Sequence, residues 1–319
     1  MRFVTSFAVV AALLVLAACG SGNKEPSAAE LCAATPEVLG NISSPDIIEA
    51  SGIAASRRNE GVLWVHNDSG DSARVFAIDR GGALLGTYAL AGADAIDWED
   101  MAIGPGPDDG DYLYLADIGD NDAARDDIVV YRVPEPEVSP SDTPVAPELS
   151  GVEKLVLRYP DHAHDAETLL VDPTNGDIII VTKELTTPPS LVFVAPGDIA
   201  AGTPYTLERA GQIDFAARGT GDQPPAGAPP LVAGVPDLPT GGDVSPDGRL
   251  VAIRTYAYVW VWDRPKGTSL SEAVASPPCQ APSNVEEQGE AIAFDADGSG
   301  YITVSEGEGV ALNHFTSSS

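Results

Sequence analysis

Acidic residues recur at the start of short apolar segments in this chain. Glu99, Glu167 and Glu290 open the runs EDMAIG, ETLLVD and EAIAFD. Each run is followed by a Gly-containing turn and a second apolar run, which predicts an antiparallel hairpin. Because the start of one strand returns beside the end of the other, Glu167 is expected next to Lys183. The sequence therefore predicts hairpins with charged side chains at their open ends.

The second apolar runs also end in polar residues. The five runs are VLWVHND, YLYLADI, IIIVTKE, LVAIRTY and YITVSEG, and their sixth residues are Asn67, Asp117, Lys183, Thr255 and Glu306. Strand side chains alternate between two faces, so one shared position should point one way. We expect these side chains to converge at one end of the molecule.

Several carboxylates around one opening cannot all remain ionised without a counter-charge. Ca²⁺ is the hard cation that accepts several carboxylate and carbonyl oxygens in a loose geometry. The candidate calcium ligands are Glu99, Asp117, Glu167, Glu290 and Glu306. The candidates for direct contact with a bound ligand are Asn67, Asp68, Lys183, Arg254 and Tyr256. A mixed set of this kind suits an anion held through calcium and cationic groups, and it equally suits internal ion pairs.

The residue types of the chain disfavour a zinc site. The chain has four histidines, and His162 and His164 stand two apart with no Cys or HExxH context. We expect both to be exposed loop residues. The sequence also has no GxSxG elbow, P-loop or GxGxxG fingerprint, so it identifies no nucleophile.

The hairpins belong to a repeated unit of short strands. Five first strands can be aligned from Ser51, Glu99, Glu167, Gly242 and Glu290. Third strands follow in each unit, and fourth strands can be proposed in several, which predicts an all-β propeller of five blades. Two Pro-rich stretches, 134–151 and 223–241, are expected to be insertions in this repeat. Six blades are the alternative, with LVAGV as the one clear strand of a blade within 214–240.

The last unit has no room for its own fourth strand. Residues 37–42, EVLGNI, are apolar enough to supply it, which would close the ring with N-terminal chain and remove an exposed edge. Cys32 and Cys279 would both lie at this junction. In an oxidising compartment they are expected to form a disulfide, with two free thiols as the alternative.

The N-terminus has the features of a bacterial export signal. Arg2 precedes an apolar stretch that ends Leu-Ala-Ala-Cys, which resembles a lipobox with Cys19 as the lipid-bearing residue. We therefore expect a signal peptide over 1–18, a lipidated cysteine and flexible tether over 19–36, and one propeller domain over 37–316. The chain would be exported and anchored by lipid to the outer face of the cell membrane.

The charge of the chain limits its partners. A formal net charge of −31 argues against nucleic acid and favours cations or basic ligands, although much of the acidity serves solubility. We expect a small-molecule or envelope ligand, with the membrane contacted through the lipid on Cys19. The sequence does not specify the oligomeric state.

The strand heads HDAETLL and QGEAIAFDADGSGYITVSEG resemble those of the phytase-like, "esterase-like activity of phytase" propellers. That resemblance implies calcium-facing carboxylates at Glu167 and Glu290, with Glu306 nearby and Lys183 as a phosphate contact. The rim has fewer basic residues than a phytase uses. The leading hypothesis is therefore a propeller that binds a ligand at a Ca²⁺-dependent rim. The alternatives are a Ca²⁺-dependent phosphoester hydrolase and a non-catalytic envelope scaffold.

Overall fold

The computed structural model describes residues 26–139, 147–185, 189–218 and 225–317. The predicted signal peptide and Cys19 lie outside these residues, as do parts of both Pro-rich stretches. Within the described chain, no helix combines the length and the apolar character needed to cross a bilayer.

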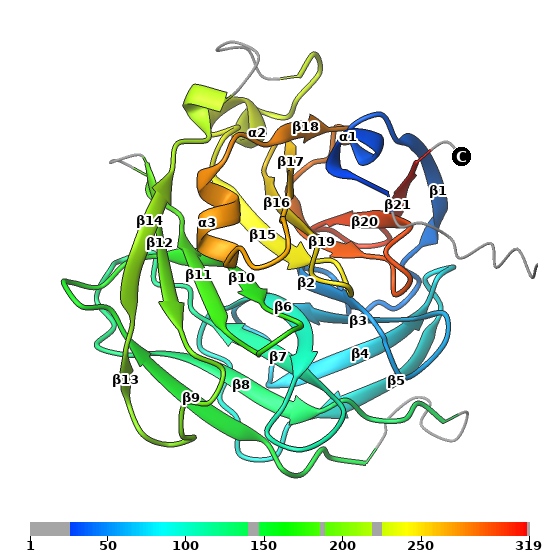
Figure 1. Ribbon diagram of the computed structural model, residues 1–319. Helices are drawn as coiled ribbons and strands as arrows, with labels where there is room; N and C mark the ends of the chain where they lie inside the picture. The colour runs from blue at the N-terminus through cyan, green and yellow to red at the C-terminus, as the bar shows by residue number, and fades with distance from the viewer. Residues whose placement is uncertain (1–25, 140–146, 186–188, 219–224, 318–319) are drawn as a thin grey trace, which may run out of the picture.

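The described strands form five predominantly antiparallel sheets arranged around a common centre (Figure 1). Blade 1 contains β2 (Ala50–Ala55), β3 (Val62–Asn67), β4 (Arg74–Asp79) and β5 (Leu84–Ala89). Blade 2 contains β6 (Trp98–Pro105), β7 (Asp111–Asp117), β8 (Ile128–Pro134) and β9 (Glu153–Arg158). Blade 3 contains β10 (Ala166–Val171), β11 (Ile178–Thr182), β12 (Ser190–Ala195) and β14 (Glu208–Ile213). Blade 4 contains β15 (Pro239–Val244), β16 (Leu250–Thr255), β17 (Val259–Asp263) and β18 (Cys279–Ala281). Blade 5 contains β19 (Gly289–Phe294), β20 (Gly300–Ser305), β21 (Ala311–Thr316) and the N-terminal β1 (Thr35–Asn41).

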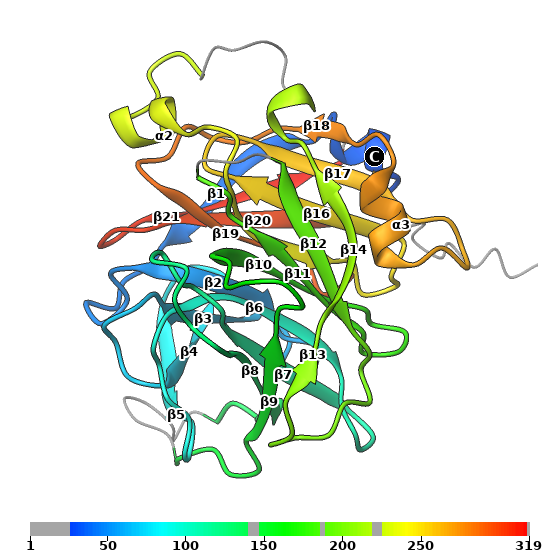
Figure 2. The same cartoon turned by 90° about the vertical axis from the view of Figure 1, so that its left-hand side faces the viewer.

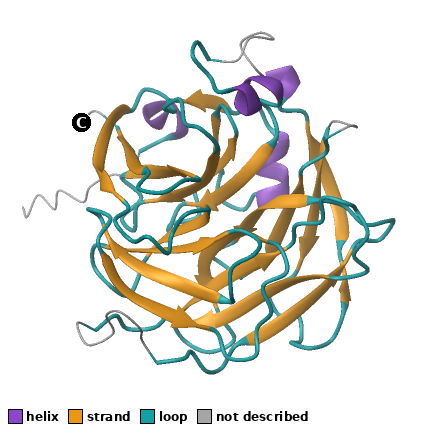
Figure 3. Cartoon of the chain, turned by 180° about the vertical axis from the view of Figure 1, so that it is seen from behind, coloured by secondary structure: helices purple, strands orange, loops and turns teal. Residues whose placement is uncertain are grey.

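The first strand of each blade packs against the first strands of its two neighbours, so β2, β6, β10, β15 and β19 form a closed inner ring. Five apolar clusters fill the spaces between blades, one at each interface. Figure 3 shows how completely strands dominate, with the short helices at the periphery. The chain is therefore a five-bladed β-propeller, as the sequence predicts.

The ring closes as predicted. β1 pairs antiparallel with β21 and becomes the outer strand of blade 5. A short helix, α1 (Ala28–Leu31), precedes β1, and its apolar side chains Ala28 and Leu31 pack into the cluster between blades 4 and 5. Cys32 and Cys279 form a disulfide with a Cα–Cα separation of 6.2 Å.

The region proposed for a sixth blade has another structure. Its one clear strand candidate, LVAGV, lies largely in the helix α2 (Pro230–Gly234), and a 3₁₀ turn, η2 (Ala216–Arg218), precedes it. Proline at the first helical position favours a helix start, which explains why the apolar run is not extended. A third helix, α3 (Leu270–Ala275), connects β17 to β18.

One proposed fourth strand is divided between two blades. The segment YTLERAG contributes β13 (Tyr205–Thr206), which pairs parallel with β9 of blade 2 (Figure 2), while its remainder begins β14 of blade 3. This segment therefore links two neighbouring sheets at their outer edges.

Candidate functional site at the mouth of the ring

A β-bulge occurs at the same point of all five inner strands. The pairing with the second strand skips one residue each time, and these residues are Ser51, Glu99, Glu167, Thr240 and Glu290. Bulges bend a strand and redirect a side chain. Four of the five aligned strand starts are thus structurally equivalent, and the fourth unit should be aligned from Thr240 instead of Gly242.

The bulges bring three glutamates to one end of the ring. The other two bulge residues hold neighbouring backbone: Ser51 Oγ donates to the Glu99 carbonyl at 2.6 Å, and Thr240 Oγ1 donates to the Glu290 carbonyl at 3.0 Å. Hydroxyl groups at two bulges therefore fix the backbone from which two of the glutamates project.

We call this end of the ring the mouth. It is lined by Asp68, Asp97, Glu99, Asp165, Glu167, Lys183, Tyr256, Glu290 and Glu306, which interact electrostatically with one another. The second strands contribute Asp68, Lys183, Tyr256 and Glu306 just beyond their last residues. The sequence predicts that Lys183 and Glu306 share one row with Asn67, Asp117 and Thr255, and this is wrong. The residues that pair with the residue before each bulge are Asn67, Asp117, Thr182, Thr255 and Ser305, so Lys183 and Glu306 lie one position beyond that row.

Three carboxylates from two adjacent blades gather closely in the mouth. Asp68 follows β3, while Asp97 and Glu99 flank Trp98 at the start of β6, and one oxygen from each of the three lies within 4.8 Å of the others. The Glu99 side chain is buried, yet among the described residues its carboxylate has no hydrogen-bond donor. This grouping has the composition of a hard-cation site.

Burial and mutual repulsion raise the pKa of these acids. Burial, then the charge of Asp68, raise the pKa of Glu99 well above its usual range. The same two causes raise the pKa of Asp97 to about 6. Desolvation and Glu306 raise the pKa of Glu290 to about 8, and desolvation and Asp68 raise that of Glu306 to about 7. In each case burial is the larger cause, and a neighbouring carboxylate adds to it.

Lys183 places an ammonium group among the acids of the mouth. Its ammonium is paired with Glu167, as predicted, lies 3.9 Å from Asp165 Oδ2, and stands 6.0 Å from the Tyr256 ring centre. The side chain is only 8% exposed, so these interactions occur in a partly desolvated environment. One ammonium does not offset the surrounding acids.

A glycine leaves room for the acid cluster. A Cβ at Gly119 would lie 2.1 Å from Glu99 Oε1 and 2.5 Å from Asp97 Oδ2. Gly119 N also donates to the Asp97 carbonyl at 3.2 Å. Any larger residue here would displace both carboxylates.

Asp117 fixes the backbone of one residue of the three-carboxylate cluster. It is fully buried, accepts from Arg125 Nη1 at 2.9 Å, and accepts from the Asp97 backbone N–H at 3.1 Å. Asp117, a predicted calcium ligand, thus holds the Asp97 backbone and lies apart from the three-carboxylate cluster.

Asn67, a predicted ligand contact, has its side-chain amide fully engaged with neighbouring protein groups. The Asn67 side chain accepts from the N–H groups of Ile48 and Glu49 and donates to Asp46 O and Asp71 Oδ2. It therefore organises the loop before β2.

Arg254 is enclosed between blades 4 and 5, where its guanidinium pairs with Glu286 and donates to the carbonyls of Ala291 and Val304 at 3.2 Å each. Its side chain is 1% exposed, so the structure assigns it to the interface between blades.

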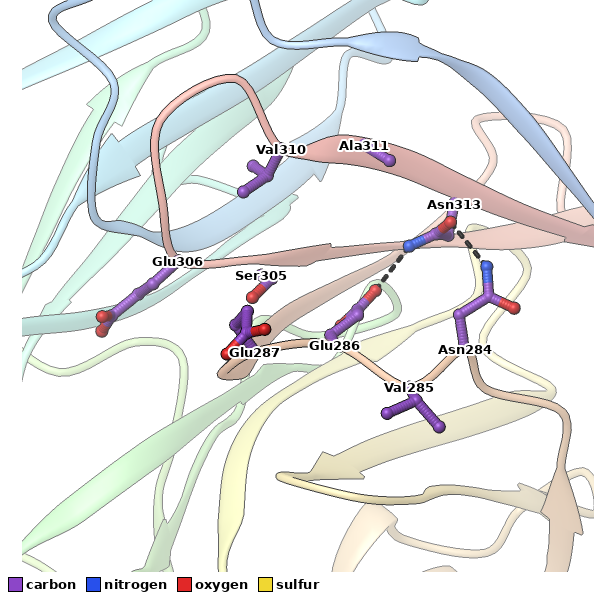
Figure 4. Close-up of a pocket in the computed structure, with 9 residues that line it drawn as sticks. All are labelled: Asn284, Val285, Glu286, Glu287, Ser305, Glu306, Val310, Ala311 and Asn313. Atoms are coloured by element: carbon purple, nitrogen blue, oxygen red, sulfur yellow. Dashed lines mark hydrogen bonds between the residues drawn. The ribbon is translucent and has the colours of Figure 1, made fainter. Parts of the chain in front are cut away.

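Asp97 is the mouth residue that the sequence reading missed. A signal for it exists, because Asp97-x-Glu99 and Asp165-x-Glu167 share one spacing at the heads of two inner strands. Glu306 was found, and it also borders a hollow of about 420 Å³ beside blade 5. Figure 4 shows its carboxylate pointing away from Glu286 and Asn313, which line the hollow.

The fold and the mouth together define this chain as a five-bladed β-propeller with an acidic opening. No protein-family model matches the chain, and no curated protein gives a significant match. Among solved structures it is similar to hydrazine synthase of Kuenenia stuttgartiensis, with a TM-score of 0.41 and 13% identity over 85% of this chain and 96% of that chain.

Proposed function

We propose that this protein is an exported, lipid-anchored β-propeller that binds its ligand at the mouth through a divalent cation, Ca²⁺. The observation that carries the proposal is the cluster of Asp68, Asp97 and Glu99. Calcium binds oxygen at 2.3–2.6 Å, so oxygens on opposite sides of one ion are about 4.8 Å apart. The three carboxylates fit within that limit. The phytase-like resemblance of the strand heads agrees with a calcium-facing mouth.

Calcium would leave coordination positions for a ligand. It takes six to eight oxygens, and three carboxylates do not fill that number even when some bind through both oxygens. A ligand with anionic oxygens would complete the coordination sphere and come close to Lys183, the cation of the mouth. The propeller thus offers a metal and an ammonium to one anionic group.

A Ca²⁺-dependent phosphoester hydrolase is the second candidate, and Lys183 is the residue that favours it. In that reaction bound calcium would offset charge on the phosphate and orient a water molecule. The mouth provides one ammonium for a highly charged ester, which is why binding remains our first proposal. A scaffold for an envelope partner would use the blade loops and need no metal.

Thermal unfolding with calcium and with chelator tests the proposal. We expect Ca²⁺ at 100 times its Kd to stabilise the wild type by about 2.7 kcal/mol, and Glu99→Gln to reduce that gain. Gly119→Ala should weaken calcium binding about tenfold, or about 1.4 kcal/mol, because its methyl group displaces Asp97 and Glu99. Gly211→Ala is the matched control, since a Cβ there has no atom of the described chain within 4 Å.

A phosphomonoester assay on the same samples separates the candidates. Turnover that requires calcium and falls with Glu167→Gln or Glu290→Gln would establish the hydrolase. Calcium-linked stabilisation without turnover supports a binding protein. Equal melting temperatures in calcium and in chelator would eliminate both metal-dependent functions and leave the scaffold.

A further inference from the structure

A second group of metal-ligating side chains lies in the loop between β9 and β10, apart from the three-carboxylate cluster. One ligand atom each from Asp161, His162 and His164 lies within 4.8 Å of the others. The sequence predicts that both histidines are exposed. The structure corrects this for His164, whose side chain is 3% exposed, while that of His162 is 71% exposed.

His164 has a carboxylate at each ring nitrogen. Its Nδ1 lies 2.9 Å from Glu184 Oε1, and its Nε2 lies 3.1 Å from Asp161 Oδ1. A neutral imidazole has a single N–H and can donate to only one of them. If Nδ1 donates to Glu184, the Nε2 lone pair faces Asp161, and a cation between them would satisfy both. A carboxylate that orients a histidine through its other nitrogen is the usual partner of a metal-ligating imidazole.

His162 lies near the other oxygen of the same carboxylate. Its Nδ1 is 3.6 Å from Asp161 Oδ2, and its ring centre is 4.2 Å from that of His164. Neighbouring ligand atoms of a tetrahedral zinc site are about 3.3 Å apart, given metal–ligand bonds of 2.0–2.2 Å. The separations from the two histidines, 3.1 Å to Asp161 Oδ1 and 3.6 Å to Asp161 Oδ2, lie on either side of that value.

Aromatic side chains hold the buried metal-ligating residue, His164, in place. The His164 ring packs against Tyr159 at 4.8 Å and against Phe193 at 5.3 Å between ring centres. Phe193 belongs to β12 and Tyr159 follows β9, so blades 2 and 3 fix the imidazole together. The site is thus preorganised at His164, while the His162 side chain is exposed.

We propose that Asp161, His162 and His164 bind a Zn²⁺ ion, with Glu184 as a positioning residue that orients His164. Two imidazoles and a carboxylate match zinc, whereas calcium prefers oxygen ligands alone. Three protein ligands leave one position for water or an exogenous ligand, so this would be an open site at the protein surface. The proposal does not depend on calcium binding in the mouth.

Equilibrium dialysis of the full chain against Zn²⁺ tests this site. The wild type should bind one high-affinity zinc per chain that excess Ca²⁺ does not displace. His162→Gln changes an exposed residue and should leave the fold intact while weakening zinc at least about tenfold. Glu184→Gln should cost about 10- to 100-fold, the range found when an outer partner of a metal-bound histidine is removed.

His314→Gln is the matched control. His314 also lies between two carboxylates, at 2.8 Å from Glu37 Oε1 and 2.7 Å from Asp295 Oδ2. Its neighbour is the guanidinium of Arg80, 3.3 Å from Nε2, in place of a second imidazole. Because Arg80 already supplies positive charge there, His314→Gln should retain full zinc binding.

Imidazole NMR gives a second readout, because the chain has four histidines to assign. Zinc should shift the His164 Nε2 and His162 signals and leave those of His66 and His314 unchanged. Unaltered histidine signals, zinc binding unaffected by His162→Gln, or equal loss in His314→Gln would overturn the proposal.

Discussion

At the scale of single residues, the acids of the mouth make stability depend on pH. The pKa of Glu290 is raised to about 8 and that of Glu306 to about 7, while an unfolded chain titrates glutamate near 4.5. The folded state therefore binds more protons than the unfolded state between about pH 4.5 and 8, and the contribution of these groups to the free energy of unfolding falls as pH rises through that window.

We predict that Glu290→Gln flattens this dependence. In chelator, the urea midpoint of the wild type should fall more steeply from about pH 5 to about pH 8 than that of the variant, because the amide stays neutral. Calcium should restore stability most at the upper end of the range. Glu287→Gln changes an exposed glutamate and serves as the control. Parallel curves for wild type and Glu290→Gln would show that Glu290 is not the group responsible.

The sequence predicts residues of the mouth where the repeat is regular. The strand ends predict five residues that the structure brings to one opening: Glu99, Glu167, Lys183, Glu290 and Glu306. Spacing alone does not distinguish the residue that faces the opening from its neighbour along the strand. The bulge decides which residue faces the opening, and a bulge has no fixed residue type when Ser, Glu and Thr all occupy it.

At the scale of strands, two acids of the inner strands brace the ring. Asp100 accepts from the N–H groups of Met101, Leu169 and Gly242 at 2.8, 2.9 and 3.0 Å, which joins blades 2, 3 and 4 at the centre. Asp243 similarly accepts from Phe294 N at 2.7 Å and connects blades 4 and 5. Both carboxylates thus bond to backbone of neighbouring inner strands.

We predict that Asp100→Ala destabilises the fold by about 3 kcal/mol or more, because it leaves three buried N–H groups without an acceptor. Asp100→Asn should cost less, since the amide keeps one oxygen in place. Urea unfolding measures both, with exposed Asp122→Ala as a control expected within about 0.5 kcal/mol of the wild type. If Asp100→Ala is as stable as the control, the brace does not contribute to stability.

Most strands could be predicted because their apolar runs and glycine turns repeat. The fourth unit was misaligned by two residues, since the glycines of PTGGDV give no apolar signal for β15. Gly242 is confined in the structure, where a Cβ would lie 2.8 Å from Leu170 and Thr168 side-chain atoms. Close packing of the inner strands thus favours glycine at this position. Glycine adds nothing to the apolar alternation by which a strand is predicted.

At the scale of the whole molecule, the N-terminal chain is expected to determine where the propeller resides. Cys19→Ser should yield a protein that is exported but no longer partitions with membranes, because the lipid supplies the attachment. Detergent phase partitioning of wild type and variant measures this. Wild-type protein found free in the medium would contradict the lipobox prediction. The variant should retain the melting temperature of the wild type, since Cys19 is not one of the two cysteines joined by the disulfide.

The ring itself is closed by two elements at one junction. β1 pairs with β21, and the Cys32–Cys279 disulfide joins residues 247 apart in the chain. The chain between β18 and β19 also crosses from blade 4 to blade 5. The N-terminal segment is held against blade 4 by the packing of α1 and by a hydrogen bond from Ala28 N to Asp263 Oδ1 at 3.0 Å. Opening of the ring should begin at the β1–β21 pairing, because the chain itself runs continuously from each blade into the next and only this pairing joins its two ends.

We predict that Cys32→Ser/Cys279→Ser lowers the melting temperature by several degrees or more. Restricting a loop of this length in the unfolded chain is worth on the order of 5 kcal/mol, an amount comparable to the net stability of a domain. Differential scanning calorimetry of variant and wild type measures the loss, and Cys19→Ser is the control for cysteine removal. Non-reducing peptide mapping should recover a peptide around Cys32 linked to one around Cys279. A variant as stable as the wild type would mean that β1–β21 pairing and α1 packing hold the ring closed without the covalent bond, so that opening begins at another interface.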